Sequence, residues 1–328
     1  MSGPFEVIYV ANDPNIDLIQ VQIKPEAGVE RIGIFGKQFD NKAIDKAFDY
    51  IPDDEDADPD LVLIPYNDFN KVSPHIMKYC DGLMYCGGAK EWNVQSNKCF
   101  FTKIGWTSWD AMPSLPFKHG MGASTVVGGT PFLGGGLNGA YIIKKTHLFV
   151  NGSWMEGAPM PRGPFRHTMV AVSNDEALVL GMAKIPEFRS YANTFIYNKV
   201  ANEWTPSGDL SVARTNIAAG LVEVGPGIQV VVAVGGRQPF SDLVEIFHVH
   251  NRTWSIAPHR FPYQVSNGCL SVVKRLTRLF YLGGLAANGT AMKAVHEYVH
   301  NGAWIRRHDM KEPMLDFGVL SYNNFFGA

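Results

Sequence analysis

The chain is a succession of short apolar runs separated by polar, glycine-rich turns. A representative run spans residues 230–234, is dominated by valine, and ends at the pair Gly235-Gly236. Short β-branched runs bounded by turn-forming residues favour strands over helices. Comparable runs end at Gly87-Gly88, Gly135-Gly136 and Gly283-Gly284, with a degenerate copy at Gly181-Met182. The pattern predicts an all-β chain built from many short strands.

Five tryptophans recur in near register along the chain. They are Trp109, Trp154, Trp204, Trp254 and Trp304, with separations of 45, 50, 50 and 50 residues by subtraction. An Asn or Gly stands shortly before each of the last four, and both residue types tolerate the positive φ of hairpin turns. Two markers that recur in phase indicate a repeat protein. Because a small sheet cannot bury both faces alone, the units are expected to stack around a ring.

This double-glycine and tryptophan pattern resembles the kelch repeat over roughly residues 75–310, which hold five units. The resemblance implies that each unit is one four-stranded blade of a β-propeller. It also implies a strand order A to D from the axis outward, in which strand B ends at the glycine pair and the tryptophan begins strand D. The indole is expected to pack between adjacent blades.

The two ends of the chain are expected to form one further blade together. Residues 5–10 resemble a strand B, residues 16–23 a strand C, and residues 317–322 an unpaired strand A. The sequence therefore predicts one domain over residues 1–328, an all-β, six-bladed kelch-type propeller closed by its N- and C-terminal strands. The alternative is five complete blades plus an irregular N-terminal segment.

An insertion over residues 36–74 is expected between the first and second blades. The spacing of Ile44, Ala47, Phe48 and Ile51 predicts one short amphipathic helix. The acidic run over residues 53–60 lacks the ligand alternation and the glycine of an EF-hand. We therefore expect a solvated loop there rather than a calcium site.

Charge and hydropathy exclude two classes of partner. The net charge is −2 over 328 residues, with a pI near 6.5, which argues against nucleic-acid binding through a broad basic surface. No apolar run is long enough to insert into a membrane. The first residues carry neither a basic nor an apolar signal region, which predicts a cytoplasmic protein. An extracellular protein is the alternative if the chain is a mature product.

Four cysteines are too few for a disulfide scaffold. Cys86 and Cys99 flank a polar loop and are expected on adjacent strands, either joined as a disulfide or as two reduced, partly buried thiols. A disulfide would add about 3 kcal/mol of stability in the chain-entropy model and would indicate an oxidising compartment.

Two motifs look catalytic but fall on expected strands. Residues 296–300 match H-E-x-x-H, yet on a strand the two histidines lie about 13 Å apart, too far for one zinc ion. Residues 134–139 match G-x-G-x-x-G but precede a strand, so no helix N-terminus is available for a pyrophosphate. We expect no metal and no cofactor.

Blade topology indicates where a partner would bind. The B–C loops and the D–A links emerge on one face of the propeller, here called the loop face, and loops on rigid scaffolds concentrate function. The longer B–C loops span residues 89–98, 137–145, 183–193, 237–242 and 285–294. Aromatic and basic side chains of this face are the candidate ligand-binding residues, since such residues dominate interface hot spots. They are Trp92, His119, Tyr141, Arg166, His167, Arg189, Tyr191, Arg214, Arg237 and Phe240.

The sequence predicts a monomeric, non-enzymatic scaffold for a protein or peptide, because it shows no catalytic constellation beside this loop set. The resemblance adds that relatives commonly bind acidic or polar peptides on this face. The alternative is an enzyme of isomerase or oxidase type, or a small-molecule binder, with a pocket at the channel mouth. His119, His167 and Asn267 would line that pocket, and strand-A basic residues could instead tie neighbouring blades together.

Overall fold

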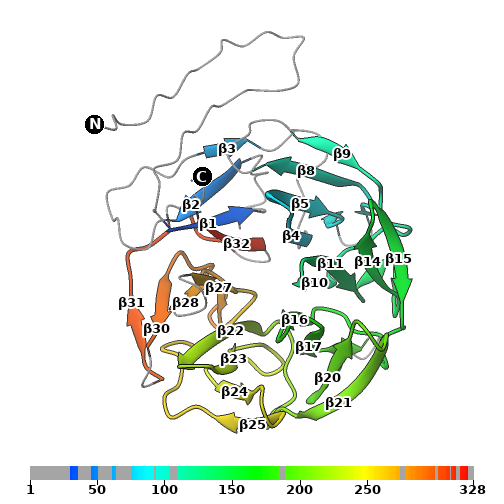
Figure 1. Cartoon of the computed structure of the whole chain (residues 1–328). Helices are drawn as coiled ribbons and strands as arrows, with labels where there is room; N and C mark the ends of the chain where they lie inside the picture. Colours follow the sequence, from blue (N-terminus) through cyan, green and yellow to red (C-terminus); the bar gives the residue numbers. More distant parts are fainter. Residues whose placement is uncertain are drawn as a thin grey trace, which may run out of the picture.

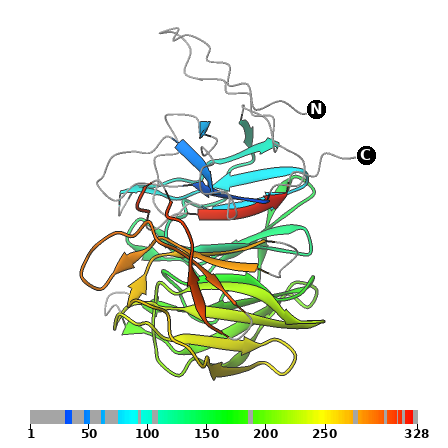
Figure 2. The ribbon, with the colours of Figure 1, turned by 90° about the vertical axis from the view of Figure 1, so that its left-hand side faces the viewer.

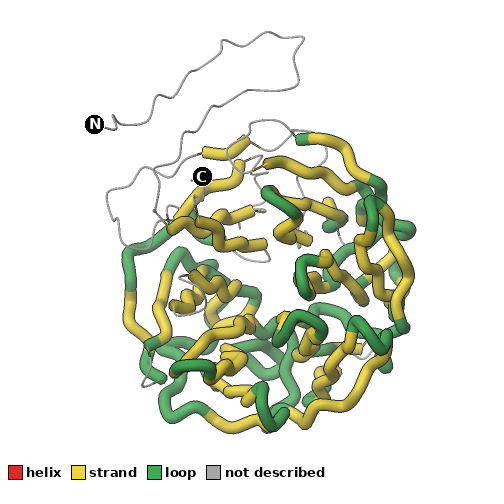
Figure 3. Tube along the Cα trace, in the orientation of Figure 1, coloured by secondary structure: helices red, strands yellow, loops and turns green. Residues whose placement is uncertain are grey.

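A computed structural model describes most of the chain. The described residues are 30–35, 46–50, 61–63, 75–91, 94–103, 109–184, 189–273, 278–299, 302–310, 312–314 and 318–323. Within these ranges the chain contains only strands, turns and loops, as the tube in Figure 3 shows. None of the described segments is a helix long and apolar enough to cross a membrane.

Five consecutive four-stranded antiparallel sheets are arranged around a central axis (Figure 1). Blade 1 consists of β4 (His75–Tyr79), β5 (Gly82–Cys86), β8 (Cys99–Lys103) and β9 (Asp110–Met112). Blade 2 consists of β10 (Ala123–Val127), β11 (Thr130–Gly134), β14 (Thr146–Val150) and β15 (Ser153–Gly157). Blade 3 consists of β16 (Thr168–Ala171), β17 (Glu176–Leu180), β20 (Asn193–Asn198) and β21 (Glu203–Asp209). Blade 4 consists of β22 (Ala218–Gly225), β23 (Ile228–Val234), β24 (Val244–His248) and β25 (Thr253–Ile256). Blade 5 consists of β27 (Cys269–Val273), β28 (Arg278–Leu282), β30 (Val295–Tyr298) and β31 (Trp304–Arg306).

The predicted all-β propeller is confirmed, with five complete blades as in the stated alternative. A further four-stranded sheet has the order β3-β2-β1-β32 and is called the terminal sheet. Its strands are β1 (Glu30–Phe35), β2 (Lys46–Tyr50), β3 (Leu61–Leu63) and β32 (Gly318–Asn323). Pairing of β1 with β32 joins the two ends of the chain, and Figure 2 shows these blue and red strands side by side.

Two details of the N-terminal prediction change. The helix expected around Ala47 and Phe48 is wrong, because β2 pairs with β1 on one side and with β3 on the other. The two ladders supply the backbone hydrogen bonds of β2. A helix this short is marginal without further contacts, so its apolar spacing does not decide the secondary structure. The strands expected at residues 5–10 and 16–23, and the acidic run at 53–60, lie outside the described residues. Both β2 and β3 lie within residues 36–74, where an insertion was expected.

The hydrophobic core lies between neighbouring blades. Between blades 2 and 3, Phe132 stacks on Tyr197 with 4.5 Å between ring centroids, and Met169 and Val179 belong to the same buried cluster. Equivalent clusters join blade 1 to blade 2, blade 3 to blade 4 and blade 4 to blade 5. Because both faces of a blade are buried against its neighbours, its strands carry apolar residues on both sides.

The repeated tryptophans tie each blade to the one before it. The Trp154 indole N–H donates to the carbonyl oxygen of Pro113 at 2.9 Å, and the Trp204 N–H donates to that of Ala158 at 3.0 Å. Each acceptor lies just after the outer strand of the preceding blade. The expected packing of the indole between blades is therefore confirmed, and Trp154 and Trp204 add a hydrogen bond to it.

Candidate functional site: the loop face

The loop face is built from D–A links pinned against B–C loops. Gly120 and Leu137 exchange two backbone hydrogen bonds of 3.1 and 2.7 Å, and Thr215 and Arg237 exchange two of 3.1 and 2.8 Å. Most of these loops also form small antiparallel ribbons of their own or pair with a link. The ribbon strands are β6 (Ala89–Glu91) with β7 (Val94–Gln95), β12 (Leu137–Asn138) with β13 (Tyr141–Ile142), β18 (Ala183–Lys184) with β19 (Arg189–Ser190), and β26 (Val265–Ser266) with β29 (Leu285–Ala286). The loops of this face are thus held in place by backbone hydrogen bonds.

A belt of backbone hydrogen bonds runs from blade to blade beneath this face. The Arg166 N–H donates to the Met121 carbonyl at 3.0 Å, the Asn216 N–H to Arg166 at 3.1 Å, and the Asn267 N–H to Asn216 at 3.2 Å. All four residues have positive φ, between 53° and 58°. Each stands two residues before strand A of its blade, so the repeat places one such residue in each of blades 2 to 5.

The double glycines allow this close approach. Gly136 has a φ of +82°, and a Cβ there would lie 2.5 Å from the Gly120 carbonyl oxygen and 2.6 Å from the Gly122 nitrogen. Any side chain would separate the B–C loop from the D–A link. The glycine pairs therefore mark the places where the loop face is held to the blades.

Six of the ten candidate residues reach the surface of the loop face. Tyr141 is the most exposed, at 81%, and Arg189 is also exposed. Arg166, Tyr191, Arg237 and Phe240 are half-buried. Trp92 lies outside the described residues.

The other three candidates are buried and are not open binding residues. His119 and Arg214 have no exposed area, and His167 is 5% exposed. His119 and His167 lie with His75 and His147 in one buried cluster. Asn267, the third expected pocket residue, is 7% exposed, and its side chain accepts a hydrogen bond from the Ser266 hydroxyl.

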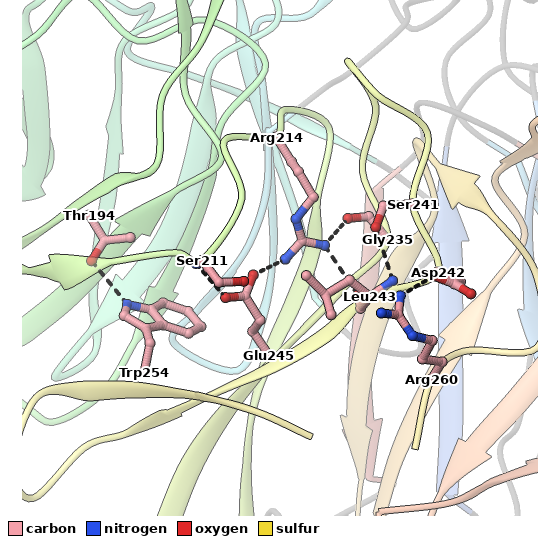
Figure 4. Close-up of polar contacts among 10 residues, drawn as sticks. All are labelled: Thr194, Ser211, Arg214, Gly235, Ser241, Asp242, Leu243, Glu245, Trp254 and Arg260. Atoms are coloured by element: carbon pink, nitrogen blue, oxygen red, sulfur yellow. Dashed lines mark hydrogen bonds and ion pairs between the residues drawn. The ribbon is translucent and has the colours of Figure 1, made fainter. Parts of the chain in front are cut away.

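Arg214 ties its own blade together, whereas the sequence offered strand-A basic residues as ties between neighbouring blades. Its guanidinium pairs with Glu245 and donates to the carbonyl oxygens of Gly235 and Leu243 (Figure 4). Glu245 also accepts the backbone N–H of Ser211 at 2.7 Å. Burial lowers the pKa of the guanidinium, and the nearby Glu245 carboxylate opposes that shift. This network fixes the B–C loop of blade 4 to the link before it.

Cations on the loop face stack on aromatic rings. The Arg162 guanidinium lies 4.6 Å from the Tyr191 ring centroid, and that of Arg237 lies 5.6 Å from the centroid of Phe240. Such contacts hold a cation in place without neutralising it. Arg162 was missed in the sequence, although it occupies the same link as Arg166.

Positive charge is unevenly distributed over the face. On blades 2 to 4, five exposed or half-buried cations form no ion pair with a described acidic residue. They are Lys118, Lys144, Arg162, Arg189 and Arg237, and are called the basic arc. Around blade 5 the cations are paired: Arg260 with Asp242 at 2.6 Å, and Arg306 with Asp309. The basic arc is therefore the part of the face best suited to a negatively charged partner.

The remaining sequence motifs have structural roles. Cys86 and Cys99 lie directly opposite each other on β5 and β8 and form a disulfide, the first of the two alternatives left open by the sequence. His296 and Glu297 lie on β30, as expected, and Glu297 accepts hydrogen bonds from Arg278 and Arg307. No group of three or more His, Cys, Asp or Glu side chains within the described ranges is arranged to hold a metal ion.

Comparison with known proteins gives one informative similarity. The chain is 25% identical to mouse (Mus musculus) Kelch-like protein 35 over 215 residues, which are 64% of this chain and 34% of that protein. The chain thus matches about a third of the length of this relative. No family model matches the chain. The phased glycine and tryptophan markers, the ring of four-stranded blades and this similarity agree, and together they support a β-propeller of the kelch-repeat type.

Proposed function

We propose that the chain is a non-enzymatic protein-binding scaffold whose binding surface is the loop face. The basic arc carries this proposal, because its five cations stand on a hydrogen-bonded surface and form no ion pair with a described acidic residue. Two of them, Arg162 and Arg237, are held against aromatic rings. Arginine beside tyrosine and phenylalanine is the composition of interface hot spots.

The partner proposed is an acidic peptide segment of another protein. Carboxylates would complement the basic arc, and exposed Tyr141 would supply apolar contact area at its edge. An enzyme at the channel mouth receives less support, since His119 and His167 are almost completely buried and offer no surface to a substrate.

We also propose that the terminal sheet serves as a sixth blade that closes the ring. In support, β32 lies beside both β27 of blade 5 and β4 of blade 1 (Figure 1). Its strand order, with β32 innermost and β3 outermost, is that of a blade. A closed ring would hold the loop face rigid from blade 1 to blade 5.

Selection from a random peptide library tests the binding proposal. Peptides selected on the unaltered protein are measured by fluorescence anisotropy against the triple variant R162A/R189A/R237A. The matched control is K78A/K103A/R252A, three cations at the A–B and C–D end of the blades. We expect acidic peptides whose affinity falls at least about tenfold in the first variant, a loss of 1.4 kcal/mol or more.

The control variant is expected to bind within about twofold of the unaltered protein. Added salt should weaken peptide binding by the control variant, which keeps the whole basic arc, more than binding by R162A/R189A/R237A. An equal loss in both triple variants, or selection of peptides without acidic residues, would contradict the proposal. Circular dichroism of the variants separates loss of binding from loss of fold.

A further inference from the structure

Four buried histidines gather where blade 2 meets blade 1. His75 begins β4, His119 lies in the link before β10, His147 lies on β14, and His167 lies in the link before β16. Their exposed fractions are 1%, 0%, 1% and 5%. This group is called the histidine seam, and the proposed binding function does not use it.

His119 stands at the centre of the histidine seam. Its ring centroid lies 5.9 Å from that of His75 and 5.8 Å from that of His147, with both ring pairs close to perpendicular. The ring of Phe117 lies 5.9 Å from His147. The buried Cys86–Cys99 disulfide and Leu133 belong to the apolar cluster between these two blades. The seam is therefore a dry contact between blades.

Several ring nitrogens of the seam have no hydrogen-bond partner in the described structure. They include both nitrogens of His119, both of His147, and Nε2 of His75. Buried polar groups are nearly always paired, since an unpaired group costs free energy. The buried site favours the neutral form of each imidazole as long as the blades keep water out. An imidazole that reaches water binds a proton more readily.

Blade 4 shows what the same two positions look like when they are charged. His119 and Arg214 each stand four residues before strand A of their blade, and His147 and Glu245 are each the second residue of strand C. In blade 4 these positions form an ion pair of opposite charges. In blade 2 they hold two like groups, so protonation there creates repulsion instead of attraction.

The charged groups that face the seam do not compensate added protons. Lys145 lowers and Glu156 raises the pKa of His147, and these two side chains are paired with each other at 2.9 Å. The described groups that shift the pKa values of His75, His119 and His167 are one another, His147 and the backbone of Gly134, besides burial itself. Among the described residues, the seam therefore has no counter-charge of its own.

We propose that the contact between blades 1 and 2 is an acid-opened seam, in which protonation of the four histidines loosens these two blades while blade 4 stays closed. The histidines take up protons when the seam opens and their rings meet water. No bond is made or broken. The state of the seam depends only on pH.

The direction and the pH window follow from the pKa values. Burial lowers the pKa of His75 to about 4 and of His167 to about 3, and that of His119 well below its ordinary value of 6.5. In an open seam these values return toward 6.5, so the open state binds more protons below that pH. Closure is fully favoured above about pH 6.5 and is lost as the pH falls toward 4. Between pH 7 and pH 5, one histidine like His75 shifts the opening equilibrium roughly 20-fold.

Hydrogen–deuterium exchange of the whole chain at pH 7 and pH 5 tests this directly. After correction for the intrinsic exchange rate, we expect peptides covering β4, β10 and β14 to lose protection by roughly 20-fold or more. Peptides covering β23 and β24 of blade 4 serve as the internal reference and should change by less than about threefold. Equal protection at both pH values, or an equal loss in every blade, would overturn the proposal.

Variants separate the histidine seam from general acid sensitivity. H119Q removes the central titrating group and is expected to reduce the pH effect on β10 and β14 by about tenfold or more. H259Q replaces an exposed histidine of blade 5 and is expected to leave it unchanged. If H119Q does not fold, H75Q provides the same measurement at the other blade. A pH effect undiminished in the folded variant would show that other groups open the seam.

Discussion

Replacing Arg214 is expected to destabilise the propeller more than any other single change to a cation of the loop face. Its side chain has no exposed area, pairs with Glu245, and donates to two backbone carbonyls. The variant R214M leaves a carboxylate that is only 1% exposed without its counter-charge. Breaking a buried ion pair from one side costs about 3–5 kcal/mol. Such a loss is a large part of the roughly 5–15 kcal/mol that stabilises a folded domain.

Urea unfolding followed by tryptophan fluorescence measures this loss. The matched control is R260M, since Arg260 pairs with Asp242 in the same blade but its side chain is 63% exposed (Figure 4). An exposed pair contributes about 0–1 kcal/mol, so this variant should unfold almost as the unaltered protein does. Equal destabilisation by R214M and R260M would refute the reasoning from burial.

The double variant R214M/E245L supplies a second check. Removing both charges leaves no unpaired ion, so it should be more stable than R214M alone by about 1–3 kcal/mol. A double variant as unstable as the sum of its two single variants would show no coupling between Arg214 and Glu245 and would refute the explanation by an unpaired charge.

Three further outcomes are expected from unfolding measurements. W204F removes the hydrogen bond from blade 3 to blade 2 and should cost about 1–2 kcal/mol, and a variant with unchanged stability would show that this hydrogen bond does not contribute. G136A should cost about 3 kcal/mol or more, because its Cβ would meet backbone atoms at 2.5 Å, whereas G152A, with similar φ and open space, should cost about 1–2 kcal/mol. Similar losses in both glycine variants would exclude steric contact as the cause. Reduction of the Cys86–Cys99 disulfide should lower the free energy of unfolding by about 3 kcal/mol, and the same reductant should not affect a C86S/C99S variant.

Local markers made the five blades predictable from sequence. Glycine at Gly136 and the indole of Trp204 each report a contact that every blade must make, so their spacing reveals the repeat. The terminal sheet lacks both markers. There β2 was predicted as a helix, because pairing with β1 and β3 from distant parts of the sequence decides its structure.

The binding face was predictable, but the exposure of its residues was not. Arg189 and Tyr141 reach the surface as expected. Arg214 does not, because its partner Glu245 is 31 residues away and no local signal connects them. His119 is buried for a similar reason, since its neighbours come from two different blades. Residue type indicates chemistry, while distant contacts decide whether that chemistry meets solvent.

The belt of backbone hydrogen bonds has a consequence for how such a face can diversify. Met121, Arg166, Asn216 and Asn267 hold one another through peptide groups, so the belt itself is indifferent to what their side chains are. Their only shared requirement is tolerance of positive φ, and a thioether, a guanidinium and two amides already satisfy it. The side chain at each of these positions can therefore change in type while the belt of backbone hydrogen bonds keeps the same shape. In these four residues the backbone maintains the architecture, and the side chains are left to vary for recognition.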